Sequence, residues 1–141
     1  MSLRYLLDTN VVSEAPRRSP DLGVLRKLRE HEGEVAIAAV VWHELLFGME
    51  RLPASRKRVA IEAYLFRIVR VTMPILAYDR AAAEWHAHQR ARLVAVGRTP
   101  PFQDGQIAAI AKVNDLILVT ANRSHFEPFE GLLVEDWRGS R

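Results

Sequence analysis

The chain of 141 residues carries 20 Lys or Arg and 17 Asp or Glu, giving a net charge of +3, and it contains no cysteine. Disulfide bonds and cysteine-based zinc sites are therefore excluded, and the length fits one domain with a single core. The first apolar run is broken by Asp8, and no stretch approaches the ~20 apolar residues of a transmembrane helix. We therefore expect no signal peptide, no membrane association and a cytoplasmic location.

In chain order, short apolar runs typical of strands alternate with longer segments of helical periodicity. The first half predicts a strand at 4–7, a loop at 16–20, a helix at 22–30, a strand at 35–38, and helices at 40–51 and 54–68. The second half predicts a strand-like segment at 69–76, a helix at 79–96 ended by Gly97, a loop at 98–102, a helix at 103–113, and strands at 116–120 and 132–135. Asn114 is expected to adopt the left-handed conformation after its helix.

Strands separated by helices pair in parallel. The pattern therefore predicts an α/β fold, a three-layer sandwich in which a parallel sheet of four or five strands is flanked by helices. The run 116–119 is apolar without alternation, as expected of a strand covered on both faces. We expect a single domain at 1–137 and a tail at 138–141 that is a candidate for disorder.

Three acids far apart in the sequence are candidates for one site. Asp8 follows the first strand, and ligands of open parallel sheets bind beyond the carboxyl ends of strands, although an Asp there also caps turns. Glu44 has only uncharged neighbours one helical turn away, so it lies at the edge of the core, in a cleft, or on a surface helix with displaced bounds. Asp104 falls in the first turn of a helix, which favours an acid, yet its neighbours Ile107 and Ala108 are core-type residues.

A fourth candidate position ends the strand at 116–120. This strand should pair with the first strand, which would bring Asn122 near Asp8; a turn Asn after a strand is the alternative. Carboxylate and amide oxygens suit Mg²⁺, or Mn²⁺ as a substitute, and such an ion binds phosphate and activates water for attack on phosphorus. No Gly-rich phosphate loop is present, and the five histidines contain no i, i+4 pair for a zinc helix.

Positive charge lies outside the segments that carry these acids. A mild basic excess is compatible with a nucleic-acid partner, although solvated helix faces explain most single cations. The cations are Arg17, Arg18, Arg26, Lys27, Arg29, Arg56, Lys57, Arg58, Arg90, Arg92 and Arg98.

Four segments, in this order, resemble the motifs of PIN-domain ribonucleases: LLDTNVVS around Asp8, VWHELLFG around Glu44, DGQIAAIA from Asp104, and LVTAN ending at Asn122. The ending from Phe126 to Trp137 is similar to the VapC-type toxin branch, including its FitB-like members. The resemblance spans residues 6–137. Each motif alone is a weak signal, but four in the right order at this spacing are fairly specific.

The resemblance implies a parallel sheet flanked by helices and an acidic Mg²⁺ or Mn²⁺ site that hydrolyses RNA. It also implies a homodimer, and an antitoxin that blocks the site and through which promoter DNA is bound. Asp8, Glu44 and Asp104 would be metal ligands, with Asn10 and Thr120 as supporting residues.

The chain departs from this pattern at the fourth acid. Many relatives have Asp where Asn122 stands, or a further acid near His125. The lost negative charge weakens a second metal more than the first, so the sequence favours one metal over two.

The predicted function is a Mg²⁺-dependent endoribonuclease that acts as the toxin of a type II toxin-antitoxin system, with Asp8, Glu44, Asp104 and Asn122 as its catalytic residues. The alternative is a binding or regulatory module of the same fold that does not cut RNA, and the missing fourth acid is its main support. A phosphatase of the haloacid-dehalogenase type is poorly supported, because no second Asp lies two residues after Asp8.

Overall fold

The central feature of the fold is a five-stranded parallel sheet. The computed structural model describes residues 2–139 and orders the strands β3-β2-β1-β4-β5. The strands are β1 (Tyr5–Leu7), β2 (Val35–Ala38), β3 (Ile75–Leu76), β4 (Ile117–Val119) and β5 (Val134–Glu135). Leu7 lies opposite Ile37 on one side and Val119 on the other. The α/β fold with four or five parallel strands is confirmed, as is the pairing of the first strand with the strand at 116–120.

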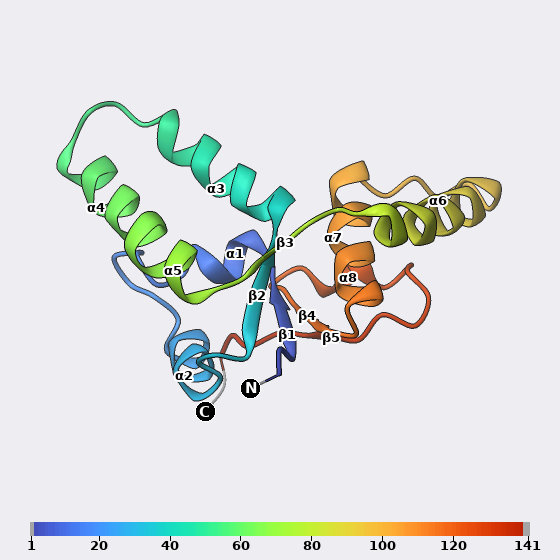
Figure 1. Cartoon of the computed structure of the whole chain (residues 1–141), viewed down its shortest axis with the longest axis horizontal. Helices are drawn as coiled ribbons and strands as arrows, with labels where there is room; N and C mark the ends of the chain where they lie inside the picture. Colours follow the sequence, from blue (N-terminus) through green and yellow to red (C-terminus); the bar gives the residue numbers. More distant parts are fainter. Residues whose placement is uncertain (1, 140–141) are drawn as a thin grey trace.

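Helices lie on both sides of this sheet (Figure 1). They are α1 (Thr9–Val12), α2 (Leu22–Glu30), α3 (Ala39–Glu50), α4 (Arg56–Tyr64), the π-helical turn η1 (Leu65–Val69), α5 (Arg70–Thr72), α6 (Arg80–Ala95), α7 (Phe102–Val113) and α8 (Arg123–Phe126). In Figure 1, α4 and α5 lie to the left of β1 and β2, and α6 and α7 lie to the right. Every residue of β1 and β2 is buried, as strands covered on both faces should be.

Side-chain caps explain where several helices begin. Asp21, Ser55 and Asp79 each accept a hydrogen bond from the backbone N–H three residues on, at 3.1, 3.1 and 2.9 Å. The predicted end of α6 at Gly97 is confirmed, because this glycine has φ +78° and reverses the chain direction.

Two local predictions are wrong. The segment 69–76 is not strand-like throughout: η1 and α5 continue the helix to Thr72, and only Ile75 and Leu76 pair with β2. Buried Leu65, Val69 and Met73 recur every fourth residue, so helical packing against the core outweighs the β-branched composition.

The left-handed residue after α7 is Asp115, with φ +55°, and not Asn114. Asn114 instead donates its side-chain amide to the Ile110 carbonyl at 2.7 Å, which satisfies a free C-terminal carbonyl of the helix.

At the end of the chain, Arg138 donates to the Ala121 carbonyl at 3.0 Å, and the Gly139 N–H lies 3.2 Å from both oxygens of Asp21. The last two residues of the predicted tail at 138–141 lie outside the described residues, and the single-domain assignment stays a prediction. Within residues 2–139, no helix combines the length and apolar character needed to cross a bilayer.

Candidate active site

Asp8 stands at the carboxyl end of the central strand and is nearly buried. Its side chain caps α1 by accepting the Thr9 N–H at 2.8 Å, and its second oxygen accepts the Thr120 hydroxyl at 2.8 Å. Asn10 adds a longer contact to the same oxygen at 3.4 Å. The capping role that the sequence left open for Asp8 is therefore shown, and its role in the site stays a prediction.

Asn10 and Thr120 join the ends of β1 and β4. The Asn10 side-chain oxygen accepts the Ala121 N–H at 3.1 Å, while the Thr120 hydroxyl accepts the Asn122 N–H at 3.0 Å. The Thr120 hydroxyl thus connects the Asn122 backbone N–H to the Asp8 carboxylate, and Asn122 lies near Asp8 as the strand pairing predicted. Its side chain is exposed and does not cap α8. Asn10 and Thr120 accordingly orient Asp8, and the part that the Asn122 amide plays in catalysis stays a prediction.

Glu44 projects from α3 into a groove with a volume of about 770 Å³. Burial raises the pKa of its carboxyl above 4.5, and the negative charges of Asp8 and Asp104 raise this pKa further. The nearby Thr9 hydroxyl lowers the pKa of Glu44 in part, although the buried Thr9 hydroxyl oxygen forms no hydrogen bond of ordinary geometry within residues 2–139. The sequence left open whether Glu44 lies at the edge of the core, in a cleft or on a surface helix, and the structure places it in a cleft.

Asp104 lies in the first turn of α7, where two preceding prolines prevent an earlier helix start. Its Oδ2 atom is buried and has no hydrogen-bond partner within residues 2–139. Burial raises the pKa of this carboxyl above 3.8, the charge of Asp8 raises the pKa further, and His125 lowers it. Such a buried, unpartnered carboxylate oxygen is costly unless something binds it.

The three acids therefore come together around one end of the sheet, and their charges repel one another. Their donor set is purely oxygen, which suits a hard divalent cation, and the orphaned Asp104 oxygen is free to bind one. Within residues 2–139, no three Asp, Glu or His side chains are arranged to hold one ion together. An ion would be held by fewer carboxylates at a time and would complete its shell with water, as Mg²⁺ commonly does.

Two contacts at the site were not predicted from the sequence. Thr9 approaches Glu44 across the gap between α1 and α3, and His125 Nδ1 of α8 lies 3.7 Å from Asp104 Oδ2. The motif positions could have suggested His125, because it occupies the region where a further acid was expected. Nothing in the sequence pairs Thr9 with Glu44, since 35 positions separate them.

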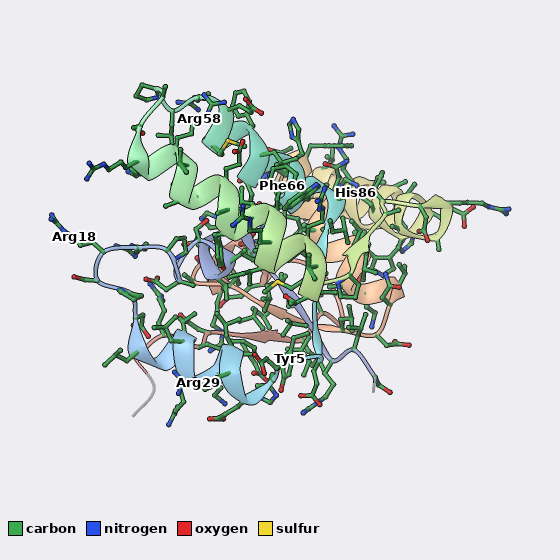
Figure 2. The ribbon with its side chains drawn as sticks, turned by 60° about the vertical axis from the view of Figure 1, so that its left-hand side comes forward. Tyr5, Arg18, Arg29, Arg58, Phe66 and His86 are labelled. Carbon is green, nitrogen blue, oxygen red and sulfur yellow. The ribbon has the colours of Figure 1, made fainter. Side chains whose placement is uncertain are left out.

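The groove beside Glu44 has an apolar wall and a cationic rim. Its wall is formed by Leu45, Met49, Leu52, Ile61 and Leu65, and its rim carries Arg17, Arg18 and Lys57. In Figure 2, Arg18 projects from the loop between α1 and α2 into solvent. Three of the cations noted in the sequence therefore gather at one opening next to a site acid.

A parallel sheet with acids at its carboxyl edge defines the class of protein. Residues 5–129 match the PIN domain model, and the chain belongs to this family.

Within the family, the chain is 34% identical to the tRNA(fMet)-specific endonuclease VapC of Shigella flexneri over 136 residues, covering 96% of this chain and 98% of the relative. It is 29% identical to toxin FitB of Neisseria gonorrhoeae, covering 94% and 97% of the two chains. The crystal structure of DNA-bound VapBC from Salmonella typhimurium superposes with a TM-score of 0.83 at 27% identity, covering 96% and 98%. The predicted resemblance to VapC- and FitB-type proteins is confirmed.

Proposed function

We propose that this protein is a Mg²⁺-dependent endoribonuclease and acts as the toxin of a type II toxin-antitoxin pair. The observation that carries the proposal is the buried Asp104 Oδ2, which accepts no hydrogen bond within residues 2–139 and lies near two further carboxylates at the carboxyl edge of the sheet. The relatives named above, a tRNA-specific endonuclease and a toxin, support the choice of RNA as substrate. A cytoplasmic location and a homodimer belong to the same proposal.

In this proposal Asp8, Glu44 and Asp104 are the protein ligands of the ion, and fewer than three of them contact it at one time. A bound Mg²⁺ would stabilise charge on the phosphate and lower the pKa of a water molecule for attack on phosphorus. Asp8 is presented in one orientation, because the Thr9 N–H and the Thr120 hydroxyl hold its two oxygens. Glu44 and Asp104 approach from α3 and α7. Burial first and the charges of the neighbouring acids second raise the pKa values of both carboxyls, and a bound cation would offset both effects.

The groove beside Glu44 supports both proposed macromolecular partners. Its cationic rim attracts the RNA backbone, and its apolar wall fits hydrophobic side chains of an antitoxin segment. An antitoxin in this groove would cover Glu44 and block the site. Promoter DNA would then be bound through the antitoxin.

The test compares the wild-type protein with Asp104→Asn. We expect the wild type to cut tRNA with Mg²⁺ or Mn²⁺ and to lose cleavage in EDTA, and we expect Asp104→Asn to lose more than about a hundredfold in rate, the usual scale for losing one contact that stabilises the transition state. A second readout is independent of activity: Mn²⁺ should raise the melting temperature of the wild type and leave that of Asp104→Asn unchanged. Full cleavage by Asp104→Asn, or equal cleavage in EDTA, would contradict the proposal.

A module that binds without cutting is the second candidate. It is favoured by one observation, the lack of three converging ligands within residues 2–139. Titration of Mn²⁺ into the purified protein separates the two candidates. Absence of both saturable Mn²⁺ binding and cleavage would favour the module.

A further inference from the structure

A separate, smaller cavity adjoins Asp104 through His125. Its volume is about 340 Å³, near the lower end of ligand pockets. It is lined by the loop between α6 and α7 and by the start of α8, through Arg98, Thr99, Pro100, Pro101, Ser124, His125 and Pro128. The cavity thus sits where the chain enters α7, directly before Asp104.

The chemistry of this lining is that of an anion site. Its polar side chains are a guanidinium, an imidazole and two hydroxyls, and no acid lines it. Arg98 is exposed, and its side chain forms no ion pair or hydrogen bond within residues 2–139. Its charge is therefore not already neutralised by the fold, unlike that of Arg92, which pairs with Glu130 at 2.8 Å.

His125 connects this cavity to the acids. It lines the cavity, and its Nδ1 atom is 3.7 Å from Asp104 Oδ2. A ligand in the cavity would therefore lie next to a phosphate held at the acids. The Glu44 groove is lined by residues of α1 and α3, whereas this cavity is lined by the loop before α7 and by α8.

We propose that the Arg98–Ser124–His125 cavity binds a backbone phosphate of single-stranded RNA adjacent to the phosphate that is cut. The proposal rests on the function proposed above and adds the path of the substrate: the strand runs from the Glu44 groove across the acids into this cavity. Arg98 is its main charge, and Ser124 offers a hydroxyl donor. The cavity is small, so it favours an unpaired strand, whose backbone is free to bend into it, over a duplex.

The test measures RNA binding without cleavage. A short fluorescein-labelled single-stranded RNA of mixed sequence is titrated in EDTA into the full chain carrying Asp104→Asn, over a range of salt concentrations. Adding Arg98→Ala should weaken binding several-fold and reduce the slope of log Kd against log salt by about 0.7, the value for one lost phosphate contact on a single strand. Adding Ser124→Asp should weaken binding further, because it places a negative charge in the cavity, and the uncharged Ser124→Asn should weaken binding less than Ser124→Asp.

The matched control is Arg29→Ala. It removes the same charge from an exposed position on α2, which lies at the opposite end of the molecule from α6 in Figures 1 and 2. In the active background, Arg98→Ala should raise KM for RNA and leave kcat unchanged, which a general loss of folding would not do.

The outcomes separate the subsite from the proposed function. Equal effects of Arg98→Ala and Arg29→Ala would overturn the subsite and leave the nuclease assignment intact. Unchanged RNA binding with weaker binding of an acidic antitoxin segment would also overturn it, because the cavity would then serve a protein. If the wild type cuts no RNA while Arg98→Ala still lowers the salt slope, phosphate binding by the cavity is supported, and the nuclease assignment fails together with the placement of the cavity next to a phosphate that is cut.

Discussion

Asp8 and Asp104 lie in the same site but are held in opposite ways. Both oxygens of Asp8 accept hydrogen bonds from the fold, through the Thr9 N–H and the Thr120 hydroxyl. Asp104 has a buried oxygen that accepts no hydrogen bond within residues 2–139, and burial raises the pKa of its carboxyl. Hydrogen bonds from the fold therefore stabilise the Asp8 carboxylate, whereas the ionised Asp104 carboxylate lowers the stability of the fold.

What positions Asp104 is backbone packing. The next residue, Gly105, lies so close to His86 of α6 that any Cβ at position 105 would overlap the imidazole ring. His86 is itself buried and shares a hydrogen bond of 2.8 Å with the Tyr78 hydroxyl. Hydrogen bonds thus orient the acid on β1, whereas close helix packing places the acid on α7. The difference predicts which substitutions cost stability and which cost only activity.

The largest expected loss of stability comes from Asp8→Ala. It removes the cap of α1, worth about 1 kcal/mol, and leaves the buried Thr120 hydroxyl without its acceptor, worth about 1 to 3 kcal/mol. We expect a loss of about 3 kcal/mol in the free energy of unfolding, measured by urea denaturation. Asp104→Ala should lower the free energy of unfolding much less. An equal loss in both variants would contradict the claim that hydrogen bonds hold Asp8 but not Asp104.

Gly105→Ala should have the next largest effect. Overpacking against His86 costs about 1 to 3 kcal/mol, and the better helix propensity of Ala offsets at most about 1 kcal/mol. Because the clash shifts the start of α7, Mn²⁺ binding should weaken as well, which calorimetric titration would detect.

The double variant Gly105→Ala with His86→Ala provides the control. Truncating the ring makes room for the new methyl group, so the double variant should be more stable than the sum of the two single changes predicts. Strictly additive losses would show that the contact between α6 and α7 does not set the position of Asp104.

The sequence predicted the hydrogen-bonded half of the site better than the packed half. Asp8, Thr120 and Asn122 follow apolar strands, and parallel pairing alone brings the ends of such strands together. Glu44 and Asp104 could be nominated from their apolar helical neighbours, but their distance from Asp8 depends on how α3 and α7 pack. Side-chain volumes across the interfaces decide that packing, and no periodicity encodes it.

The errors in the fold have the same origin. Residues 69–72 are β-branched or charged and favour a strand locally, yet burial of Val69 and Met73 keeps the helix going. The placement of His86 also depends on packing, since His86 is buried and His88, two residues on, is exposed. That the buried ring touches the residue after Asp104 follows only from the tertiary structure.

The smallest expected effect is on how stability depends on pH. Asp104 and Asp136 should change this dependence in opposite directions. The folded-state pKa of Asp104 lies above 3.8, so the folded protein binds this proton more tightly than the unfolded chain. Its cost to stability is absent below pH 3.8 and is present in full above the raised pKa. Asp104→Asn should therefore be more stable than the wild type at neutral pH, and the gain should vanish as the pH falls towards 3.8.

Asp136 supplies the opposite case. Hydrogen bonds from Arg138 hold the pKa of Asp136 below 3.8, so its ionised form stabilises the fold above that pH and loses this contribution as the pH falls through the lowered pKa. Asp136→Asn should be less stable than the wild type at neutral pH and should equal it in strong acid. Urea midpoints across the pH range would record both differences. A loss of stability in Asp104→Asn at neutral pH would mean that its carboxylate has a partner in solution, and the contrast with Asp8 would fail.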